Sequence, residues 1–214
     1  MGPNGAGKTT TIQMLLGLIK PTNGEVRIFG MAIEKNRAEI LQKVGFASAY
    51  SGMQPRLTLY ENLLIYSLIY NLPEKRKKIL GVLEDVDLLD MVGKKFGSCS
   101  SGQRTRAILA KALLPRPRLL LLDEPTASLD PDIAERIQDL LLRIVQKHKV
   151  TVLYTSHNMQ EVNKMCQRII FLMHGKIIAQ MSPQDLVKEM GKKDLNEVFI
   201  SLVREEGHVF KSQS

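Results

Sequence analysis

The first residues of the chain form a glycine-rich pattern whose spacing suits the binding of phosphate groups. Gly2-Pro3-Asn4-Gly5-Ala6-Gly7-Lys8-Thr9 fits the pattern G-x-x-x-x-G-K-[ST], and an apolar segment with helical spacing follows it. Glycines let backbone N–H groups curl around the β- and γ-phosphates, and the following helix presents its positive end to them. Lys8 adds a point charge, and Thr9 offers a hydroxyl to Mg²⁺. The pattern predicts a nucleotide site built from Gly2, Pro3, Asn4, Gly5, Ala6, Gly7, Lys8, Thr9 and Thr10.

A second group of candidate residues lies at the end of a short apolar run. Leu119-Leu120-Leu121-Leu122 is followed directly by Asp123 and Glu124. A strand that is buried on both faces has such a sequence, and acids at its C-terminal end stand where ligands bind in open α/β sheets. This placement predicts that Asp123 holds Mg²⁺ through water and that Glu124 polarises an attacking water.

A third group precedes a predicted helix that contains Arg104 and Arg106. It reads Cys99-Ser100-Ser101-Gly102-Gln103. A serine and a glycine backbone at a helix N-terminus can form a second anion site. Taken in isolation, an ordinary helix cap is the alternative interpretation of this segment.

These segments, in this order along the chain, resemble the motifs of the ABC ATPase family. The third group matches the family signature Leu-Ser-Gly-Gly-Gln at Ser100, Gly102 and Gln103, and departs from it at Cys99 and Ser101. Residues 2–9 are similar to the family's Walker A loop, and residues 119–124 are similar to its Walker B strand.

The resemblance extends over essentially the whole chain. Residues 127–130 resemble the family's D-loop, and His157 occupies the position of the switch histidine that contacts the γ-phosphate. The resemblance implies that Glu124 and His157 are catalytic and that Thr9 and Asp123 bind Mg²⁺. It also implies that ATP is contacted by a further set of residues, Ser100, Ser101, Gly102, Gln103 and Asp130.

Membership of this family would also define the working unit. The resemblance implies a head-to-tail homodimer with two ATP molecules in the interface, in which residues 2–9 of one subunit and 100–103 of the other face the same triphosphate. Such a dimer explains why one chain carries two anion-binding segments. ATP bridges the two subunits, and its hydrolysis lets them separate, which is a switch of the γ-phosphate type.

The chain departs from the family pattern at two places. Ala49 stands where the family has a glutamine that approaches the metal and the attacking water, and Gln54 lies too far along the chain to replace it. The family also has strands and an adenine-stacking aromatic residue before its Walker A loop, whereas only Met1 precedes Gly2 here. The resemblance therefore predicts an N-terminally truncated domain whose first strands are missing and which folds poorly by itself.

Hydrophobic periodicity and turn residues predict alternating strands and helices. The predicted strands are 25–29, 44–47, 119–122, 150–155, 168–173 and 176–179. The predicted helices are 10–19, 37–42, 101–114, 132–148, 159–165 and 183–190, with a largely helical stretch at 58–97 that Thr58 caps. This order predicts an α/β fold of the P-loop NTPase type, with a mostly parallel sheet and an inserted helical subdomain.

The helical stretch interrupts the alternation and so suggests the domain boundaries. We predict an ATPase core at residues 1–57 and 115–190, a helical signature subdomain at 58–114, and a C-terminal helix and tail at 191–214. Within this last segment an apolar helical stripe, Leu195, Val198, Phe199 and Leu202, is expected to dock on its own domain.

The composition is that of an ordinary folded domain. The 214 residues are 44% hydrophobic and 24% charged, and the longest apolar run, 169–173, is far shorter than the ~20 residues of a membrane span. The first residues lack a secretory signal, and two cysteines do not make a disulfide framework. The net charge of +8 suits an acidic partner such as a nucleotide, a nucleic acid or an anionic membrane face.

The combined patterns predict the ATP-hydrolysing subunit of an ABC exporter at the cytoplasmic face of the cell membrane. A separate integral membrane permease is the expected partner, ATP and Mg²⁺ are the expected cofactors, and no nucleic-acid partner is expected. The signature and the segment 195–199 resemble bacterial drug- and antibiotic-export ATPases. The alternatives are a soluble ABC ATPase that acts on DNA or ribosomes, and another P-loop enzyme such as a GTPase, although Asn163-Lys164-Met165-Cys166 lacks the aspartate of a guanine-reading motif.

Overall fold

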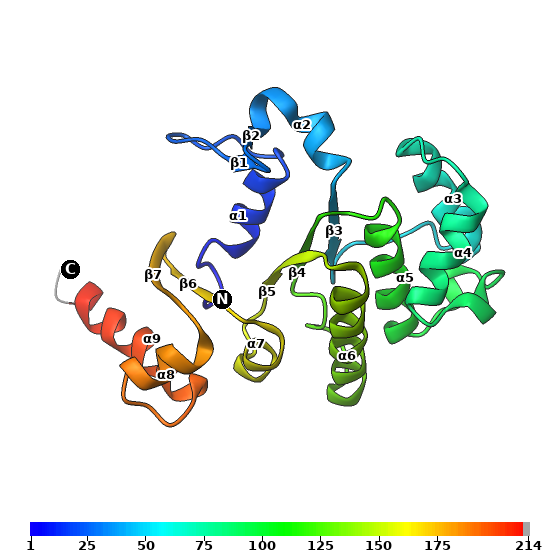
Figure 1. Cartoon of the computed structure of the whole chain (residues 1–214). Coiled ribbons are helices and arrows are strands. Elements are labelled where there is room, and N and C mark those ends of the chain that lie inside the picture. The colour runs from blue at the N-terminus through cyan, green and yellow to red at the C-terminus, as the bar shows by residue number, and fades with distance from the viewer. Residues whose placement is uncertain (212–214) are drawn as a thin grey trace. The chain divides into compact units, whose positions relative to one another are not determined.

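The computed structural model describes residues 1–211, with side chains described as far as Val203 (Figure 1). The chain forms two compact units. The smaller unit contains residues 1–11 and the chain from Thr155 onward, and the larger unit contains residues 12–154. This division differs from the predicted boundaries at 57, 114 and 190, which stay predictions.

The larger unit is built on a three-stranded sheet. Its strands β3 (Val44–Ser48), β4 (Leu119–Asp123) and β5 (Thr151–Thr155) lie in the order β3-β4-β5, and β3 and β4 are parallel. Leu120, Leu121 and Leu122 of β4 are completely buried. The apolar run before Asp123 is therefore the central strand of a parallel sheet, as the sequence predicts.

Two helices that carry predicted motifs belong to this unit. Helix α5 (Ser101–Leu113) packs against β3 and against α6 (Pro131–His148) (Figure 1). The apolar stripe of α6, which includes Ile137, Leu141 and Ile144, is buried. An amphipathic helix buries such a stripe because its apolar residues recur every three to four positions.

The first part of the larger unit holds an antiparallel hairpin whose first strand lies within the predicted strand 25–29 and whose second strand the sequence did not predict. Helix α1 (Lys8–Leu15) leads to β1 (Arg27–Ile28), β2 (Met31–Ala32) and α2 (Ile33–Leu41). The helix was expected to reach residue 19, but it ends earlier because the Leu18 N–H donates to the Gln13 carbonyl at 2.9 Å and closes the last turn. Ile12, Ile28, Ile40 and Val44 join Leu121 in one core.

The predicted helical stretch consists of α3 (Leu59–Ile69), α4 (Lys75–Asp85) and two 3-10 helices, Leu89–Met91 and Phe96–Ser98. Thr58 caps α3 as predicted, because its side chain accepts the Glu61 N–H while the Glu61 carboxylate accepts the Thr58 N–H. In the part of the chain that the structure describes, none of the helices has the length and apolar character needed to cross a membrane.

The smaller unit has its own hydrophobic core. Helix α7 (Met159–Met165) precedes the antiparallel hairpin of β6 (Ile169–Met173) and β7 (Lys176–Met181), which α8 (Pro183–Glu189) and α9 (Leu195–Lys211) follow. The predicted stripe docks on this unit, since Leu195, Val198 and Leu202 are buried and Phe199 packs against them. Residues 212–214 of the predicted tail lie outside the described residues.

The N-terminal residue runs alongside β6. The Met1 amino group donates to the Ile170 carbonyl at 2.6 Å, and the Leu172 N–H donates to the Met1 carbonyl at 2.8 Å. The glycine-rich loop therefore begins directly after a residue whose backbone is hydrogen-bonded to β6.

Candidate nucleotide-binding site

The glycine-rich loop and the start of α1 belong to the smaller unit. Gly5 and Gly7 have φ angles of 77° and 102°, which turn successive backbone groups of the loop. The Lys8 ammonium donates to the Gly2 carbonyl at 2.7 Å and to the Pro3 carbonyl at 3.1 Å, and only 9% of the residue is exposed. The lysine side chain is thus folded over the loop that precedes it.

Strand β6 and the turn after it fix this loop in place. The Gly175 N–H donates to the Ala6 carbonyl at 3.0 Å. A Cβ atom at Gly2 would lie 2.1 Å from the Leu172 carbonyl oxygen, so any larger residue at this position would collide with the backbone of β6. Glycine at position 2 is required by this close approach.

The donor set of this loop fits a triphosphate and a magnesium ion. Backbone N–H groups at the N-terminus of α1 and the Lys8 ammonium attract phosphate oxygens. Thr9 and Thr10 occupy the first turn of α1, and a hydroxyl such as that of Thr9 is an oxygen ligand of the kind that Mg²⁺ accepts.

Asp123 ends strand β4 in the larger unit, where 6% of it is exposed. The β3–β4 register places Ser48 opposite Asp123, and the Ala49 N–H donates to the Asp123 carbonyl at 3.4 Å. Position 49, where the family resemblance predicts a glutamine, therefore lies directly beside the candidate metal-binding aspartate. The backbone N–H of Gln54 donates to the Asn62 side chain at 2.8 Å.

Glu124 begins the turn that follows the sheet. Its φ angle of 48° is in the left-handed region, which few residues with a side chain adopt and which is often found at functional sites. The Ala127 N–H donates to the Glu124 carbonyl at 3.2 Å and closes the turn. This geometry holds Glu124, which the family resemblance predicts to be the catalytic carboxylate, in one backbone conformation.

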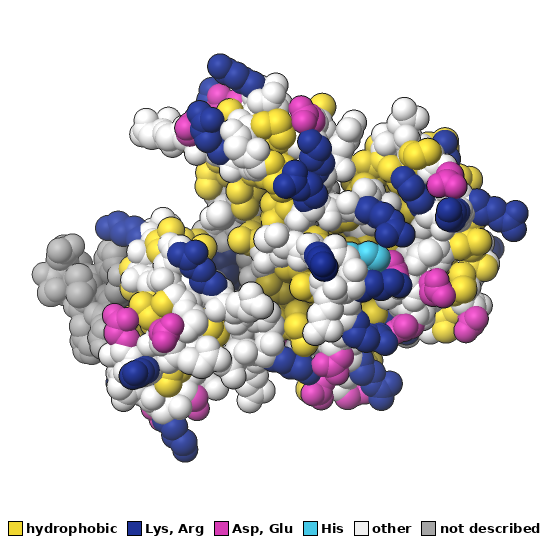
Figure 2. Space-filling view, viewed as in Figure 1, with side chains coloured by type: hydrophobic (Ala, Val, Ile, Leu, Met, Phe, Trp, Pro, Cys, Tyr) yellow, Lys and Arg dark blue, Asp and Glu magenta, His cyan; other side chains and the backbone are white. Residues whose placement is uncertain are grey.

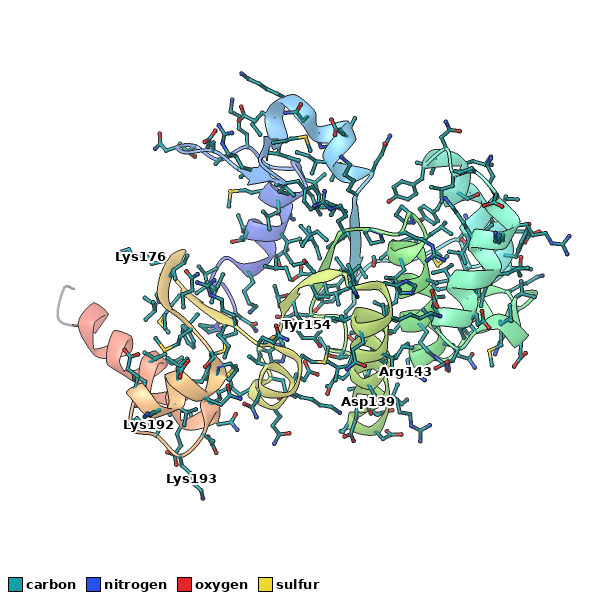
Figure 3. The ribbon with its side chains drawn as sticks, viewed as in Figure 1. Asp139, Arg143, Tyr154, Lys176, Lys192 and Lys193 are labelled. Carbon is teal, nitrogen blue, oxygen red and sulfur yellow. The ribbon has the colours of Figure 1, made fainter. Side chains whose placement is uncertain are left out.

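Two further hydroxyl groups meet close to this turn, and the sequence patterns did not single them out. Thr126 Oγ1 lies 3.2 Å from the hydroxyl of Tyr154, which Figure 3 labels on β5. Thr126 follows β4, and Tyr154 lies near the end of β5, which is the neighbouring strand of the same sheet. Their contact could therefore have been predicted only from the order of the strands. This hydrogen bond links the turn after Glu124 to β5.

The signature segment forms the capped start of α5. The Ser100 hydroxyl accepts the Gln103 N–H at 3.4 Å, and the Gln103 side-chain oxygen accepts the Ser100 N–H at 3.0 Å. The Lys94 ammonium donates to the same Gln103 oxygen at 2.9 Å. This segment is therefore both a helix cap and a helix N-terminus that can attract an anion.

The start of α5 contacts the start of α6 at the glycine of the signature. A Cβ atom at Gly102 would lie 2.8 Å from Ile133 Cγ2. Asp130 immediately precedes α6, and its carbonyl accepts the Ala134 N–H at 2.8 Å. Glycine at position 102 thus allows the signature segment to lie close to the helix that Asp130 begins.

His157 belongs to the smaller unit and is exposed. It lies in a tight turn after β5, where the Ser156 hydroxyl accepts the Asn158 N–H at 2.9 Å and donates to the Glu161 carboxylate at 2.8 Å. Asn158 then caps α7 by accepting the N–H groups of Gln160 and Glu161. The turn is well organised and presents His157 to solvent.

A glycine-rich loop that opens a helix, together with an acid-ended strand in a parallel sheet, defines the P-loop class of nucleotide-binding proteins. Comparison with known proteins gives the family. The family model described as "ABC transporter" matches residues 1–127, and the chain belongs to this family. The matched residues include the glycine-rich loop, the signature segment and the acid-ended strand, whereas His157 and most of the predicted D-loop lie beyond them and stay predictions.

Curated relatives include ATP-binding proteins of antibiotic transport and resistance systems. The chain is 40% identical over 195 residues to the bacitracin transport ATP-binding protein BcrA of Bacillus licheniformis, covering 91% of this chain and 63% of BcrA. It is 35% identical over 219 residues to the linearmycin resistance ATP-binding protein LnrL of Bacillus subtilis, covering 98% of this chain and 70% of LnrL. The chain thus spans about two thirds of the length of these relatives.

A solved structure confirms the fold. The structure of cbiO1 from Clostridium perfringens, described as part of the ABC transporter complex cbiONQ, matches with a TM-score of 0.81 and 25% identity. The match covers 99% of this chain and 85% of cbiO1. The α/β P-loop fold predicted from the sequence is therefore confirmed.

Proposed function

We propose that this chain binds and hydrolyses ATP and that it powers a separate membrane permease of an ABC-type exporter. The observation that carries the proposal is the loop of residues 2–9, in which Lys8 folds over a glycine-rich turn at the N-terminus of α1. The names of BcrA and LnrL, which refer to transport of and resistance to antibiotics, support an export role.

Each site residue has a role in this proposal. The loop N–H groups and Lys8 hold the triphosphate, and Thr9 and Asp123 hold Mg²⁺, which neutralises charge on the phosphate oxygens. Glu124 accepts a proton from the attacking water, and His157 contacts the γ-phosphate. Residues Ser100–Gln103 and Asp130 of a second subunit complete the site in a head-to-tail homodimer.

The permease is proposed to dock on the helical block. Ile65, Leu68 and Ile69 lie on α3 and are exposed. Residues spaced three and four apart lie on one face of a helix, and an exposed apolar patch commonly marks a protein or membrane contact. This docking would hold the chain at the cytoplasmic face of the membrane.

The first prediction concerns ATP hydrolysis by the full chain and two variants. Lys8→Ala is expected to abolish ATP binding, because the desolvated triphosphate loses its cationic partner. Glu124→Gln is expected to retain ATP binding and to lower kcat at least about 100-fold, because an amide is not a base. The measurements are phosphate release and fluorescent-ATP titration, each with GTP as the competing nucleotide.

Lys20→Ala is the matched control, because Lys20 is an exposed lysine that follows α1 and lies outside the glycine-rich loop. Its kcat and ATP affinity should equal those of the parent chain. Parent-rate hydrolysis by Glu124→Gln would contradict the catalytic assignment, and a preference for GTP would contradict the assignment of ATP as the substrate.

A further inference from the structure

A short acidic segment joins three helices of the larger unit at one point. We call Asp85, Val86 and Asp87 the acidic junction; it comprises the last residue of α4 and the turn that follows. Val86 is completely buried, and Asp87 has a φ angle of 55°. A buried anchor followed by a left-handed residue gives this turn a defined conformation, at an energetic cost for a residue other than glycine.

Asp87 bonds to α5 and α6 at the same time. Its carbonyl accepts a hydrogen bond from Arg106 Nη1 of α5 at 3.0 Å. Its carboxylate accepts one from Arg143 Nη2 of α6 at 2.7 Å, and Figure 3 labels Arg143 on that helix. The turn is therefore a bridge between the helix that carries the signature and the helix that begins after Asp130.

Asp85 forms a second link to the C-terminal end of α6. Its side chain is only 8% exposed, and its two oxygens lie 2.6 Å from Lys147 Nζ and 2.8 Å from His148 Nε2. The hydrogen bond to Asp85 raises the pKa of Lys147. Figure 2 shows acidic and basic side chains gathered beside a histidine over this end of α6.

The helices that meet at the junction both begin at candidate ATP-binding residues. Helix α5 begins after Ser100, α6 begins after Asp130, and the two helix starts touch where Gly102 approaches Ile133. Because a helix is a stiff element, fixing α5 and α6 to one turn elsewhere along their lengths also fixes the relative placement of their N-termini.

We propose that Asp85 and Asp87 are positioning residues that hold the Ser100–Gln103 segment at a fixed place relative to Asp130. The inference rests on the proposed function, in which both segments of one subunit contact the ATP of the other. Hydrolysis requires both segments in place at once, and a displacement of ~1 Å can lower a rate by a large factor. The junction acts through the two helices and does not itself contact the nucleotide.

The test compares the full chain with the double variant Asp85→Asn/Asp87→Asn, which keeps side-chain size and removes both charges. Asparagine also tolerates the left-handed conformation at position 87. We expect kcat for ATP to fall about fivefold, the effect of a coupling of about 1 kcal/mol within one network. The ATP affinity should stay unchanged, because residues 2–9 are untouched. Amide hydrogen exchange at Gln103, Arg104 and Ala134, whose N–H groups are hydrogen-bonded at the two helix starts, should become faster.

Two further variants separate positioning from general stability. Arg143→Gln should lower kcat. Arg143→Lys should keep most of the parent's kcat, because a lysine keeps the positive charge opposite Asp87. Glu39→Gln removes a comparable ion pair, Glu39–Lys43 at 2.8 Å, away from the junction, and should leave kcat and exchange at both helix starts unchanged.

The proposal is overturned if the double variant exchanges like the parent at both helix starts. It is also overturned if the double variant loses thermal stability while its kcat per folded molecule stays at the parent value. If the parent chain itself fails to hydrolyse ATP, the proposed function fails, and the exchange comparison still decides whether the junction positions the two segments.

Discussion

Ala49 is the residue at which this site departs most clearly from the family chemistry. Its N–H donates to the carbonyl of Asp123, so a longer side chain at this position would start beside the backbone of the candidate metal-binding residue. A methyl group neither binds a metal ion nor orients a water molecule. The alignment of Ala49 with the family glutamine stays a prediction, and the backbone contact gives it a structural reason.

Ala49→Gln is predicted to raise Mg²⁺-dependent ATP hydrolysis. A new hydrogen bond to the attacking water, worth about 1 kcal/mol, corresponds to an increase in kcat of roughly fivefold. Steady-state phosphate release at saturating ATP measures the change. Ala49→Leu is the control for side-chain bulk without an amide. An unchanged or lower kcat for Ala49→Gln would mean that another residue orients the water.

Two helices of the larger unit, α3 and α5, begin with the same kind of capping box. Thr58 and Glu61 cap α3, and Ser100 and Gln103 cap α5. Hydrogen bonds of the same kind therefore stabilise α3, which has no proposed contact with the nucleotide, and α5, which carries the signature. This pair allows the stabilising role of a cap to be measured separately from its role in hydrolysis.

Ser100→Ala and Thr58→Ala are each predicted to lower the free energy of unfolding by about 1 kcal/mol, the usual effect of losing a cap. Only Ser100→Ala should also lower kcat, because Ser100 is proposed to help complete the site of the ATP that the partner subunit binds. Urea unfolding and phosphate release on the two variants make the comparison. Equal loss of kcat in both would show that the effect comes from stability alone.

The cap of α3 should also depend on pH. Hydrogen bonds from the backbone and side chain of Thr58 lower the pKa of Glu61. A lowered pKa in the folded state gives stability that is present above the unfolded pKa and is lost as the pH falls through the folded pKa. Glu61→Gln should therefore be less stable than the parent at pH 7, and this difference should shrink as the pH falls from 7 to 3. A constant difference across this range would contradict the assignment.

The whole molecule carries two segments that can attract an anion, residues 2–9 and 100–103, and the proposed ATP-bridged dimer uses both of them. Each segment places backbone N–H groups at a helix N-terminus, where an anion is stabilised. A triphosphate shared between two subunits would use one segment from each. Assembly should therefore require ATP that is bound but not hydrolysed.

The Glu124→Gln variant is predicted to form a dimer, with twice the molecular mass of the chain, in the presence of ATP and Mg²⁺. With ADP it is predicted to remain a monomer. Light scattering coupled to size-exclusion chromatography measures the mass. The double variant Lys8→Ala/Glu124→Gln should stay monomeric with either nucleotide, because it does not bind ATP. A dimer that forms without nucleotide would argue against ATP as the bridge.

Features that depend on residues close together in the chain could be predicted from the sequence. It predicted the glycine-rich loop before α1, the Thr58 cap, the buried run that ends at Asp123 and the docked stripe of α9. These features follow from local backbone conformation, capping and hydrophobic periodicity, which short segments encode. The family and the fold class could therefore be predicted before any coordinate was known.

Only the tertiary structure decided which distant residues meet. The contact of Ala49 with Asp123 depends on strand register, and the approach of Gly102 to Ile133 depends on helix packing. Asp85 gave no distinctive sequence signal, since its partners Lys147 and His148 lie 62 and 63 residues away. Such contacts arise when buried surfaces of separate elements pack, and the free energy of that packing belongs to the whole core rather than to any one segment.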